Sequence, residues 1–279
     1  MDDFLFDLEN PLTTSKEHQS DIVPSLFSDE SGFLLHSFPA NFRNEALLLI
    51  SKFCENVDPF VSYLAVNYMD RFISTKKFVN QEKPWMVGLL AISCVSLAVK
   101  MKNSDFPIPN LQGYGCLIYD SKSISRMEVL ILTCLNWRMR SITPFAFLNY
   151  FISLFEFKDT CLSQAVKDRA SQIILKSSYE FKLLEFRPSV IAASALLHAS
   201  RDLIPPQHSH FRAAITSCKY LNNESLDDCF GIMQDITSDS NESISVLDYQ
   251  CTSSESENST SIKKRKLNGA LSFSQVQNH

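Results

Sequence analysis

The stretch Pro84–Met101 reads PWMVGLLAISCVSLAVKM and decides the fold class. It carries no charged side chain before Lys100, and its large apolar residues would lie on every side of a helix. At ~1.5 Å per residue its charge-free part is about 24 Å long, shorter than the ~30 Å hydrocarbon core of a bilayer. A helix that is apolar all round is buried by other helices. The stretch therefore predicts the central helix of an all-α bundle and argues against a membrane span.

A second stretch with the same character follows later in the chain. Pro188–Leu203 reads PSVIAASALLHASRDL and is free of charge until Arg201. Other segments carry apolar residues at helical spacing, and we expect helices at 41–56, 59–74, 109–117, 121–137, 144–155, 160–184, 206–218 and 223–236. The pattern predicts two tandem five-helix bundles, over residues 39–141 and 142–238.

Composition supports this fold and limits the function. The chain has only six glycines, too few for the hairpin turns of a β-rich protein. Its net charge of -5 argues against a large nucleic-acid-binding surface, which would need a basic face. None of the eight cysteines forms a CxxC pair, as expected for free thiols of an intracellular protein.

The two ends of the chain differ from the bundles. Residues 1–38 show no sustained periodicity, so we expect a mostly flexible segment without a secretory signal. Residues 239–279 form a Ser/Thr/acidic tail that cannot bury enough surface to order itself. The tail contains a basic tetrad, which is either a nuclear import signal or a solubilising charge cluster: Lys263, Lys264, Arg265 and Lys266. We expect the protein in the nucleus, and also in the cytoplasm.

No catalytic constellation is visible in the sequence. The motifs GxGxxG, GxxxxGK[ST], HExxH and GxSxG are absent, and the six histidines are scattered. We therefore expect no enzyme activity, no cofactor and no metal ion.

Several blocks of sequence go further than composition. Ser62–Ser74 (SYLAVNYMDRFIS), Cys94–Met101 (CVSLAVKM) and Arg126–Phe151 (RMEVLILTCLNWRMRSITPFAFLNYF) closely resemble the cyclin box of plant D-type cyclins. Leu184–Ser200 (LEFRPSVIAASALLHAS) resembles their second box. The chain looks like a member of the divergent, D6-like subgroup that lacks the LxCxE motif.

The resemblance implies two five-helix cyclin folds and a regulatory subunit that activates a cyclin-dependent kinase, promoting G1/S progression or a specific cell division. It also implies kinase inhibitor proteins as further partners. Carried over by position, Lys100, Glu128 and Leu89 would bind the kinase. Arg43 and Asp70 would form an ion pair that braces the first helix of the box against the second.

Each of the two charged kinase-facing residues has a second interpretation. A lysine at a helix C-terminus is favoured by the helix dipole alone. Ser125 and Glu128 fit the S-x-x-E capping box, so Glu128 could serve only to begin a helix. Asp120 or Ser121 is the better cap, and would leave Glu128 beyond the first turn.

The chain also departs from the family pattern. It has no LxCxE run, so we expect no retinoblastoma docking through that motif. The apolar patch with which the family docks substrates is divergent here, and its positions hold Phe42, Glu45, Ala46 and Leu49. Recruitment of substrates through basic-apolar motifs is therefore in doubt.

Other classes of function stay open beside the kinase activator. A pseudo-cyclin or cyclin-fold adaptor would bind a kinase, an inhibitor or a transcription partner without activating a kinase. A cyclin-fold transcription factor would grip DNA, but it would need a basic groove, and the acidic total counts against it.

Overall fold

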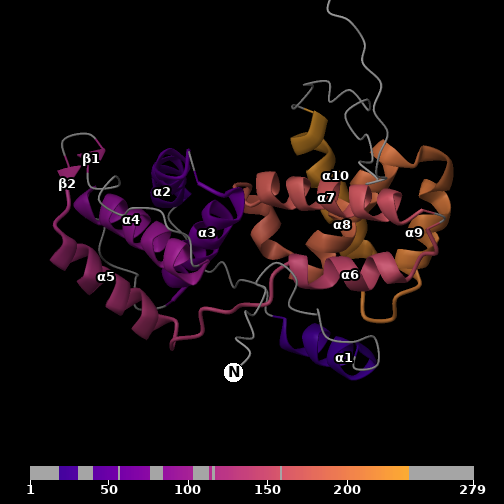
Figure 1. The fold of residues 1–279 in the computed structure, drawn as a ribbon, viewed down its shortest axis with the longest axis horizontal. Helices are drawn as coiled ribbons and strands as arrows, with labels where there is room; N and C mark the ends of the chain where they lie inside the picture. The colour runs from indigo at the N-terminus through magenta and orange to yellow at the C-terminus, as the bar shows by residue number, and fades with distance from the viewer. Residues whose placement is uncertain are drawn as a thin grey trace, which may run out of the picture. The chain divides into compact units, whose positions relative to one another are not determined.

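The computed structural model describes residues 19–30, 40–55, 57–75, 84–102, 113–114, 117–157 and 159–238, and these are almost entirely helical (Figure 1). The first helical bundle contains α2 (Ala40–Phe53), α3 (Pro59–Ile73), α4 (Pro84–Met101) and α5 (Ser121–Cys134). The second contains α6 (Phe145–Ser153), α7 (Thr160–Ser177), α8 (Pro188–Leu203), α9 (His208–Thr216) and α10 (Asn223–Ser238), with the short 3-10 helices η4 (Phe181–Glu185) and η5 (Pro205–Gln207). The predicted all-α fold of two tandem bundles is confirmed.

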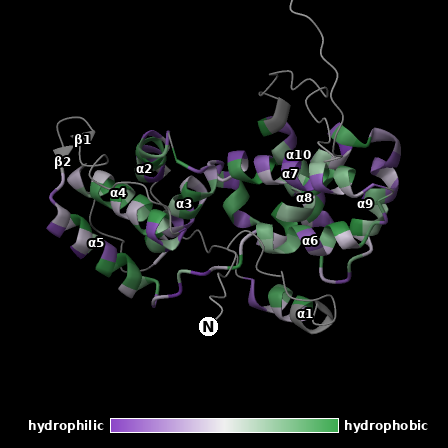
Figure 2. Cartoon of the chain, in the orientation of Figure 1, coloured by the Kyte–Doolittle hydropathy of each residue, from purple (hydrophilic) through white to green (hydrophobic). Residues whose placement is uncertain are grey.

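The helix α4 is the centre of the first bundle, as its sequence predicts. Every residue from Met86 to Val99 is buried, because α2, α3 and α5 pack around it. Its small polar residues Ser93 and Ser96 are 0% exposed and allow these neighbours to come close. Figure 2 shows the hydrophobic residues that run along this helix.

The helix α8 has the same place in the second bundle. It packs against α6, α7, α9 and α10, and its residues from Ser189 to Ser200 are buried, apart from the partly buried Ile191. The repeat of the charge-free, small-residue pattern in α4 and α8 thus corresponds to a repeat of their position in the fold.

Three helices begin where an aspartate can cap them. The carboxylate of Asp58 accepts a hydrogen bond from the backbone N–H of Phe60, and Pro59 opens α3. Asp120 caps α5 in the same way through Ser123, and Asp159 caps α7 through Cys161. The helix α6, by contrast, begins at Phe145, after Pro144, without a side-chain cap.

The expected helix at 109–117 is wrong for the part of it that the structure describes. Gly113–Tyr114 (β1) pairs antiparallel with Leu117–Ile118 (β2), so a two-residue ladder stands there instead. Several other predicted helices are shorter than expected: α2 ends at Phe53, α5 at Cys134, α6 at Ser153 and α7 at Ser177, and α9 spans only His208–Thr216.

The N-terminal segment contains a helix that the sequence analysis missed. Within residues 1–38, expected to be flexible, Gln19–Asp29 form α1. Phe27 contacts the aromatic side chains of α6 and stacks on Tyr220 with ring centroids 4.8 Å apart. The carboxylate of Glu30 accepts hydrogen bonds from the backbone N–H (2.9 Å) and the hydroxyl (2.7 Å) of Ser189, the second residue of α8. The expected tail at 239–279, with its basic tetrad, lies outside the described residues.

Candidate functional site

An ion pair with one buried and one accessible partner joins α4 to α5. The ammonium of Lys100 lies 2.7 Å from each carboxylate oxygen of Glu128, and the hydroxyl of Ser96 donates to the same carboxylate at 2.5 Å. The Glu128 side chain is only 10% exposed, whereas that of Lys100 is 50% exposed. The buried carboxylate is therefore satisfied by three hydrogen bonds, and it orients an ammonium group that still faces solvent.

This geometry bears on the second, purely local interpretation of each residue. Asp120 caps α5, so Glu128 lies beyond the first turn and is not part of a capping box. Lys100 pairs with a specific carboxylate rather than only with the dipole of α4. The Lys100 ammonium stays accessible to a partner, while Glu128 is buried beneath it, and kinase contact by the two residues stays a prediction.

The end of α5 exposes a tryptophan. The backbone N–H of Trp137 bonds to the carbonyl of Leu132 (2.8 Å), and that of Asn136 bonds to the carbonyl of Thr133 (3.1 Å). These are the two bonds of a Schellman motif, with asparagine in the left-handed position at φ 52°. Trp137 follows at φ 60°, a conformation that costs a bulky residue about 1–3 kcal/mol, and its side chain is 67% exposed.

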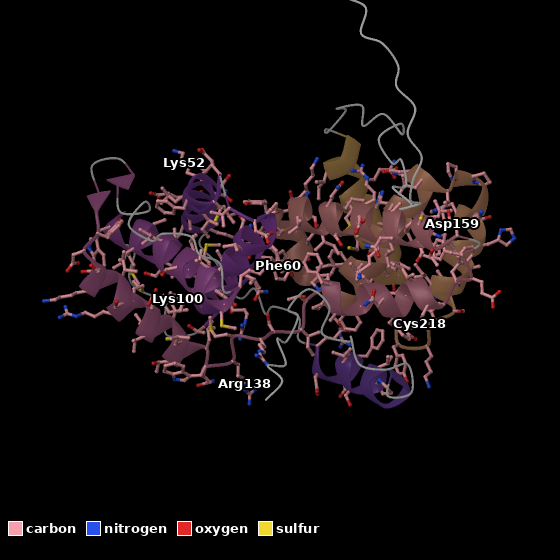
Figure 3. All side chains as sticks on the ribbon, in the orientation of Figure 1. Lys52, Phe60, Lys100, Arg138, Asp159 and Cys218 are labelled. Atoms are coloured by element: carbon pink, nitrogen blue, oxygen red, sulfur yellow. The ribbon has the colours of Figure 1, made fainter. Side chains whose placement is uncertain are left out.

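We group the residues at the end of α4 and along and just beyond α5 under one name, the α4–α5 face, and define it by Lys100, Glu128, Leu132 and Trp137. Glu128 and Leu132 are four residues apart and so lie on the same side of α5. Leu132 is partly buried, and it is bonded through its carbonyl to Trp137. Val129 (54% exposed) and Leu130 (45%) are exposed on other sides of α5, because residues one and two positions from Glu128 do not share its side of the helix. Hydrophobic and hydrophilic residues alternate along α5 in Figure 2. Figure 3 labels Lys100 and also Arg138, the neighbour of Trp137.

Leu89 does not belong to this face. It is 7% exposed and belongs to the core around α4. Its burial is the same as that of Glu128, and a contact of Leu89 with a kinase stays a prediction.

The predicted partners Arg43 and Asp70 do lie together, and their pair reaches further than the sequence suggested. The guanidinium binds the carboxylate through two hydrogen bonds of 2.8 and 3.0 Å. It also donates to the backbone carbonyls of Ser178 (3.2 Å) and Tyr179 (3.0 Å), just after α7. Burial raises the pKa of the Asp70 carboxyl, although Arg43 opposes the shift. One buried arginine thus connects α2, α3 and the second bundle.

The four positions of the expected docking patch are not together on the surface. Phe42 is 7% exposed and Ala46 is 0% exposed, so both belong to the core. Leu49 is partly buried and Glu45 is exposed. An apolar patch of the kind that the family uses is therefore not formed by these four residues.

Two further findings limit the kind of site. Among the described helices, none is long and apolar enough to cross a membrane. In the same part of the chain, no group of three or more His, Cys, Asp or Glu side chains could hold a metal ion.

Comparison with known proteins decides the family. Residues 15–140 match the family model "Cyclin, N-terminal domain", and residues 142–264 match "Cyclin, C-terminal domain". A protein of Arabidopsis thaliana named "Putative cyclin-D6-1" is 39% identical over 92% of this chain and 94% of its own length. The chain belongs to the cyclin family.

Other relatives agree with this assignment. "Cyclin-D6-1" of Oryza sativa subsp. japonica is 36% identical over 83% of this cyclin and 74% of its own length. The crystal structure of a viral cyclin from herpesvirus saimiri superposes with a TM-score of 0.60, at 18% identity, over 78% of this chain and 96% of that one. The D-type resemblance is thus confirmed by sequence, and the cyclin fold by structure. As a member of this family, the protein is a regulatory subunit rather than an enzyme.

Sequence reasoning missed two residues of the α4–α5 face in this cyclin, Leu132 and Trp137, and the tryptophan carries more of the argument. Trp137 was assigned to the end of a helix, although a signal against that was present. Asn136 is one of the few residues that readily adopt the left-handed conformation that ends helices, and it directly precedes the tryptophan. A tryptophan that follows the end of a helix no longer lies on the side of that helix that packs into the core. Here Trp137 is exposed to solvent.

Proposed function

We propose that this cyclin binds a cyclin-dependent kinase through its α4–α5 face and activates it. The observation that carries the proposal is an oriented, accessible ammonium at the end of α4 together with an exposed tryptophan just beyond the end of α5. Aromatic anchors beside a fixed charge are typical of the few residues that dominate binding energy at protein interfaces.

The chemistry of this face fits a helix of the kinase. The ammonium of Lys100 has three N–H donors. Two of them bind the two carboxylate oxygens of Glu128, and the third is left for an acceptor on the partner. Trp137 and the apolar side chains of α5 would cover the apolar stripe of an amphipathic helix. The free carbonyls at the C-terminal end of such a helix would supply the acceptor for Lys100.

Activation follows if that helix is the αC helix of the kinase. Phosphoryl transfer in protein kinases requires the ion pair between a lysine on strand β3 and a glutamate on αC. A cyclin that binds the αC-in state more tightly than the αC-out state stabilises the active state by the difference in binding free energy. The cyclin contributes no catalytic group.

The test is co-expression of the full-length cyclin with the catalytic subunit of a plant cyclin-dependent kinase. Complex formation and histone phosphorylation are measured for the wild type and for the double variant Lys100→Ala/Glu128→Ala. Removing both charges avoids leaving the buried carboxylate unpaired. We expect the double variant to bind at least about tenfold more weakly, equivalent to ~1.4 kcal/mol, and to lose activation in proportion.

Two results would change the proposal. Binding of the wild type without phosphorylation would favour a pseudo-cyclin that occupies a kinase without activating it. Equal binding by the wild type and the double variant would remove Lys100 and Glu128 from the interface.

The biological setting is part of the same proposal. By analogy with the D-type relatives, we propose action in the nucleus, with a cytoplasmic fraction, at G1/S or in a specific cell division. The acidic total charge supports a protein partner over DNA.

A further inference from the structure

The segment after α5 is held by two residues of α3 that lie on the same side of that helix. Asn67 and Arg71 are four residues apart, and so are neighbours on the helix surface. One nitrogen of the Arg71 guanidinium donates to the backbone carbonyl of Arg138 at 2.6 Å. The hydroxyl of Ser141 donates to the side-chain oxygen of Asn67 at 2.9 Å.

These two contacts fix the chain immediately after Trp137. The Schellman bonds hold it from the side of α5, and Arg71 holds the next carbonyl from the side of α3. Met139, two residues further on, is buried in the core with 7% exposure. Trp137 is thus an exposed residue in a short segment that is anchored on both sides.

Stability alone does not explain why an arginine stands at this position. The second terminal nitrogen of Arg71, Nη1, is buried and has no hydrogen-bond partner among the described residues. Burial lowers the pKa of the guanidinium, so its surroundings disfavour the charge. A buried donor without an acceptor destabilises a fold, and such a group calls for another explanation. The hydrogen bond from Arg71 to the carbonyl of Arg138 provides such an explanation.

We propose that Arg71, together with Asn67, is a positioning residue for partner binding. It keeps Trp137 in its left-handed, exposed conformation before the kinase arrives, so that little conformational entropy is lost on association. The inference rests on the proposed function, because it assumes that Trp137 contacts the kinase. It adds a residue outside the α4–α5 face that controls the affinity of that face.

The experiment uses the two tryptophans of the chain. Trp85→Phe gives a full-length parent in which Trp137 is the only tryptophan. Acrylamide quenching and fluorescence anisotropy of the free protein then report the mobility of Trp137. In the Arg71→Met variant we expect lower anisotropy, because methionine keeps an unbranched apolar stem but cannot donate to the Arg138 carbonyl. Arg71→Lys should restore part of the anisotropy, since an ammonium can still donate.

A double-mutant cycle connects this mobility to binding. The affinity for the kinase subunit is measured for the parent, for Arg71→Met, for Trp137→Ala and for both changes together. We expect each single change to weaken binding by about tenfold or more, and the double variant to bind no more weakly than Trp137→Ala alone. Losses that multiply in the double variant would overturn the inference, because Arg71 would then act independently of Trp137.

The outcomes separate this inference from the proposed function. If the parent binds no kinase, the proposed function is contradicted. The anisotropy then tests only whether Arg71 holds Trp137 in place, and an unchanged anisotropy in Arg71→Met would overturn that. If Arg71→Met does not fold, Asn67→Ala replaces it in the same cycle. That variant removes the other anchor, and it should show a smaller, equally non-additive loss.

Discussion

Single buried charges in this cyclin are held by several hydrogen bonds each. Glu128 accepts three, and Arg43 donates four, two to Asp70 and two to the backbone of the second bundle. Such groups contribute little net stability as a pair, because desolvation offsets their attraction. Removing only one partner of such a pair is strongly destabilising, because the remaining charge stays buried without an opposite charge beside it.

Asp70→Ala should therefore destabilise the protein by about 3–5 kcal/mol. The variant leaves the guanidinium of Arg43, which is 0% exposed, with only two backbone carbonyls. The free energy of unfolding is measured by urea denaturation. Asp202→Ala is the matched control, since it breaks an ion pair with Arg169 whose side chains are 26% and 38% exposed, and it should cost less than about 1 kcal/mol. Equal effects of the two changes would contradict the structural role of Asp70.

A second residue at this scale is the buried histidine of α8. His198 is 1% exposed, and its ring stacks on Phe230 of α10 with centroids 4.0 Å apart. One ring nitrogen lies 2.9 Å from the Phe230 carbonyl, and the other lies 3.1 Å from the guanidinium of Arg201. Because a guanidinium can only donate, the ring accepts from Arg201 and donates to the carbonyl, which requires neutral imidazole.

The stability of the second bundle should consequently decrease at low pH. Burial lowers the pKa of His198 below its ordinary value of 6.5, and nearby Arg201 and His208 act in the same direction, while Asp202 and the Phe230 carbonyl oppose them. The unfolded chain then binds more protons than the native chain, so the free energy of unfolding falls as the pH drops below about 6.5. Urea midpoints between pH 7.5 and 5.5 measure this.

The control for the pH dependence is a substitution of the same type at an exposed position. His198→Gln should flatten the pH profile, although it also lowers stability at neutral pH, whereas His210→Gln on the surface of α9 should leave the profile unchanged. A profile of His198→Gln as steep as that of the wild type would assign the effect to other groups, such as His208, whose pKa burial also lowers.

At the scale of elements, α1 is held on the second bundle by one aromatic and one charged contact. Phe27 packs against Tyr220 and Phe147, and Glu30 accepts two hydrogen bonds at the N-terminus of α8. A carboxylate at this end of a helix binds the free N–H groups and the positive end of the helix dipole. Burial raises the pKa of the Glu30 carboxyl, and the hydrogen bonds from Ser189 act in the opposite direction.

Replacing Glu30 should release α1 and weaken the start of α8. We expect Glu30→Ala to cost about 1–2 kcal/mol, the usual effect of a lost helix cap. Hydrogen exchange should show faster exchange in α1 and in the first turn of α8, with little change in α4. Asp29→Ala, at an exposed neighbouring position, is the control. If both variants exchange like the wild type, Glu30 does not hold α1 in place.

The sequence predicted most helices but missed some of their ends, the helix α1 and the β1–β2 ladder, for physical reasons that the residues show. The helices α4 and α8 follow from local pattern, because a charge-free run must be buried wherever it lies. The cap at Asp120 is also a local signal. By contrast, α1 has few apolar residues and a proline at position 24, and it is stabilised by contacts with residues far along the chain.

The candidate site divides in the same way. The family resemblance predicted that Lys100 and Glu128 both bind the kinase but not that they pair with each other, since no spacing connects residues 28 positions apart. The burial of Leu89, Phe42 and Ala46 depends on which side of each helix meets a neighbour. The contact of Arg71 with the Arg138 carbonyl involves a backbone atom, for which a sequence has no signal.

On the scale of the whole molecule, the proposed nuclear action depends on residues outside the described part of the chain. We expect that replacing Lys263, Lys264, Arg265 and Lys266 by alanine reduces nuclear accumulation, because import receptors read such basic clusters. The protein is fused to several copies of a fluorescent protein, so that the fusion is too large to diffuse into the nucleus, and is imaged in plant cells. Replacing four serines of the same tail is the control. Unchanged nuclear fluorescence would make the tetrad a solubilising cluster.

The central claim is that this cyclin presents a kinase-binding face on α4 and α5, and one titration tests it most directly. The affinity of a plant cyclin-dependent kinase subunit is measured by calorimetry for the wild type, for Trp137→Ala and for Leu48→Ala. Leu48 is a matched control, because it is 65% exposed on α2 while Trp137 is 67% exposed. We predict a loss of at least about tenfold for Trp137→Ala and none for Leu48→Ala. Equal affinities of all three proteins would contradict the account.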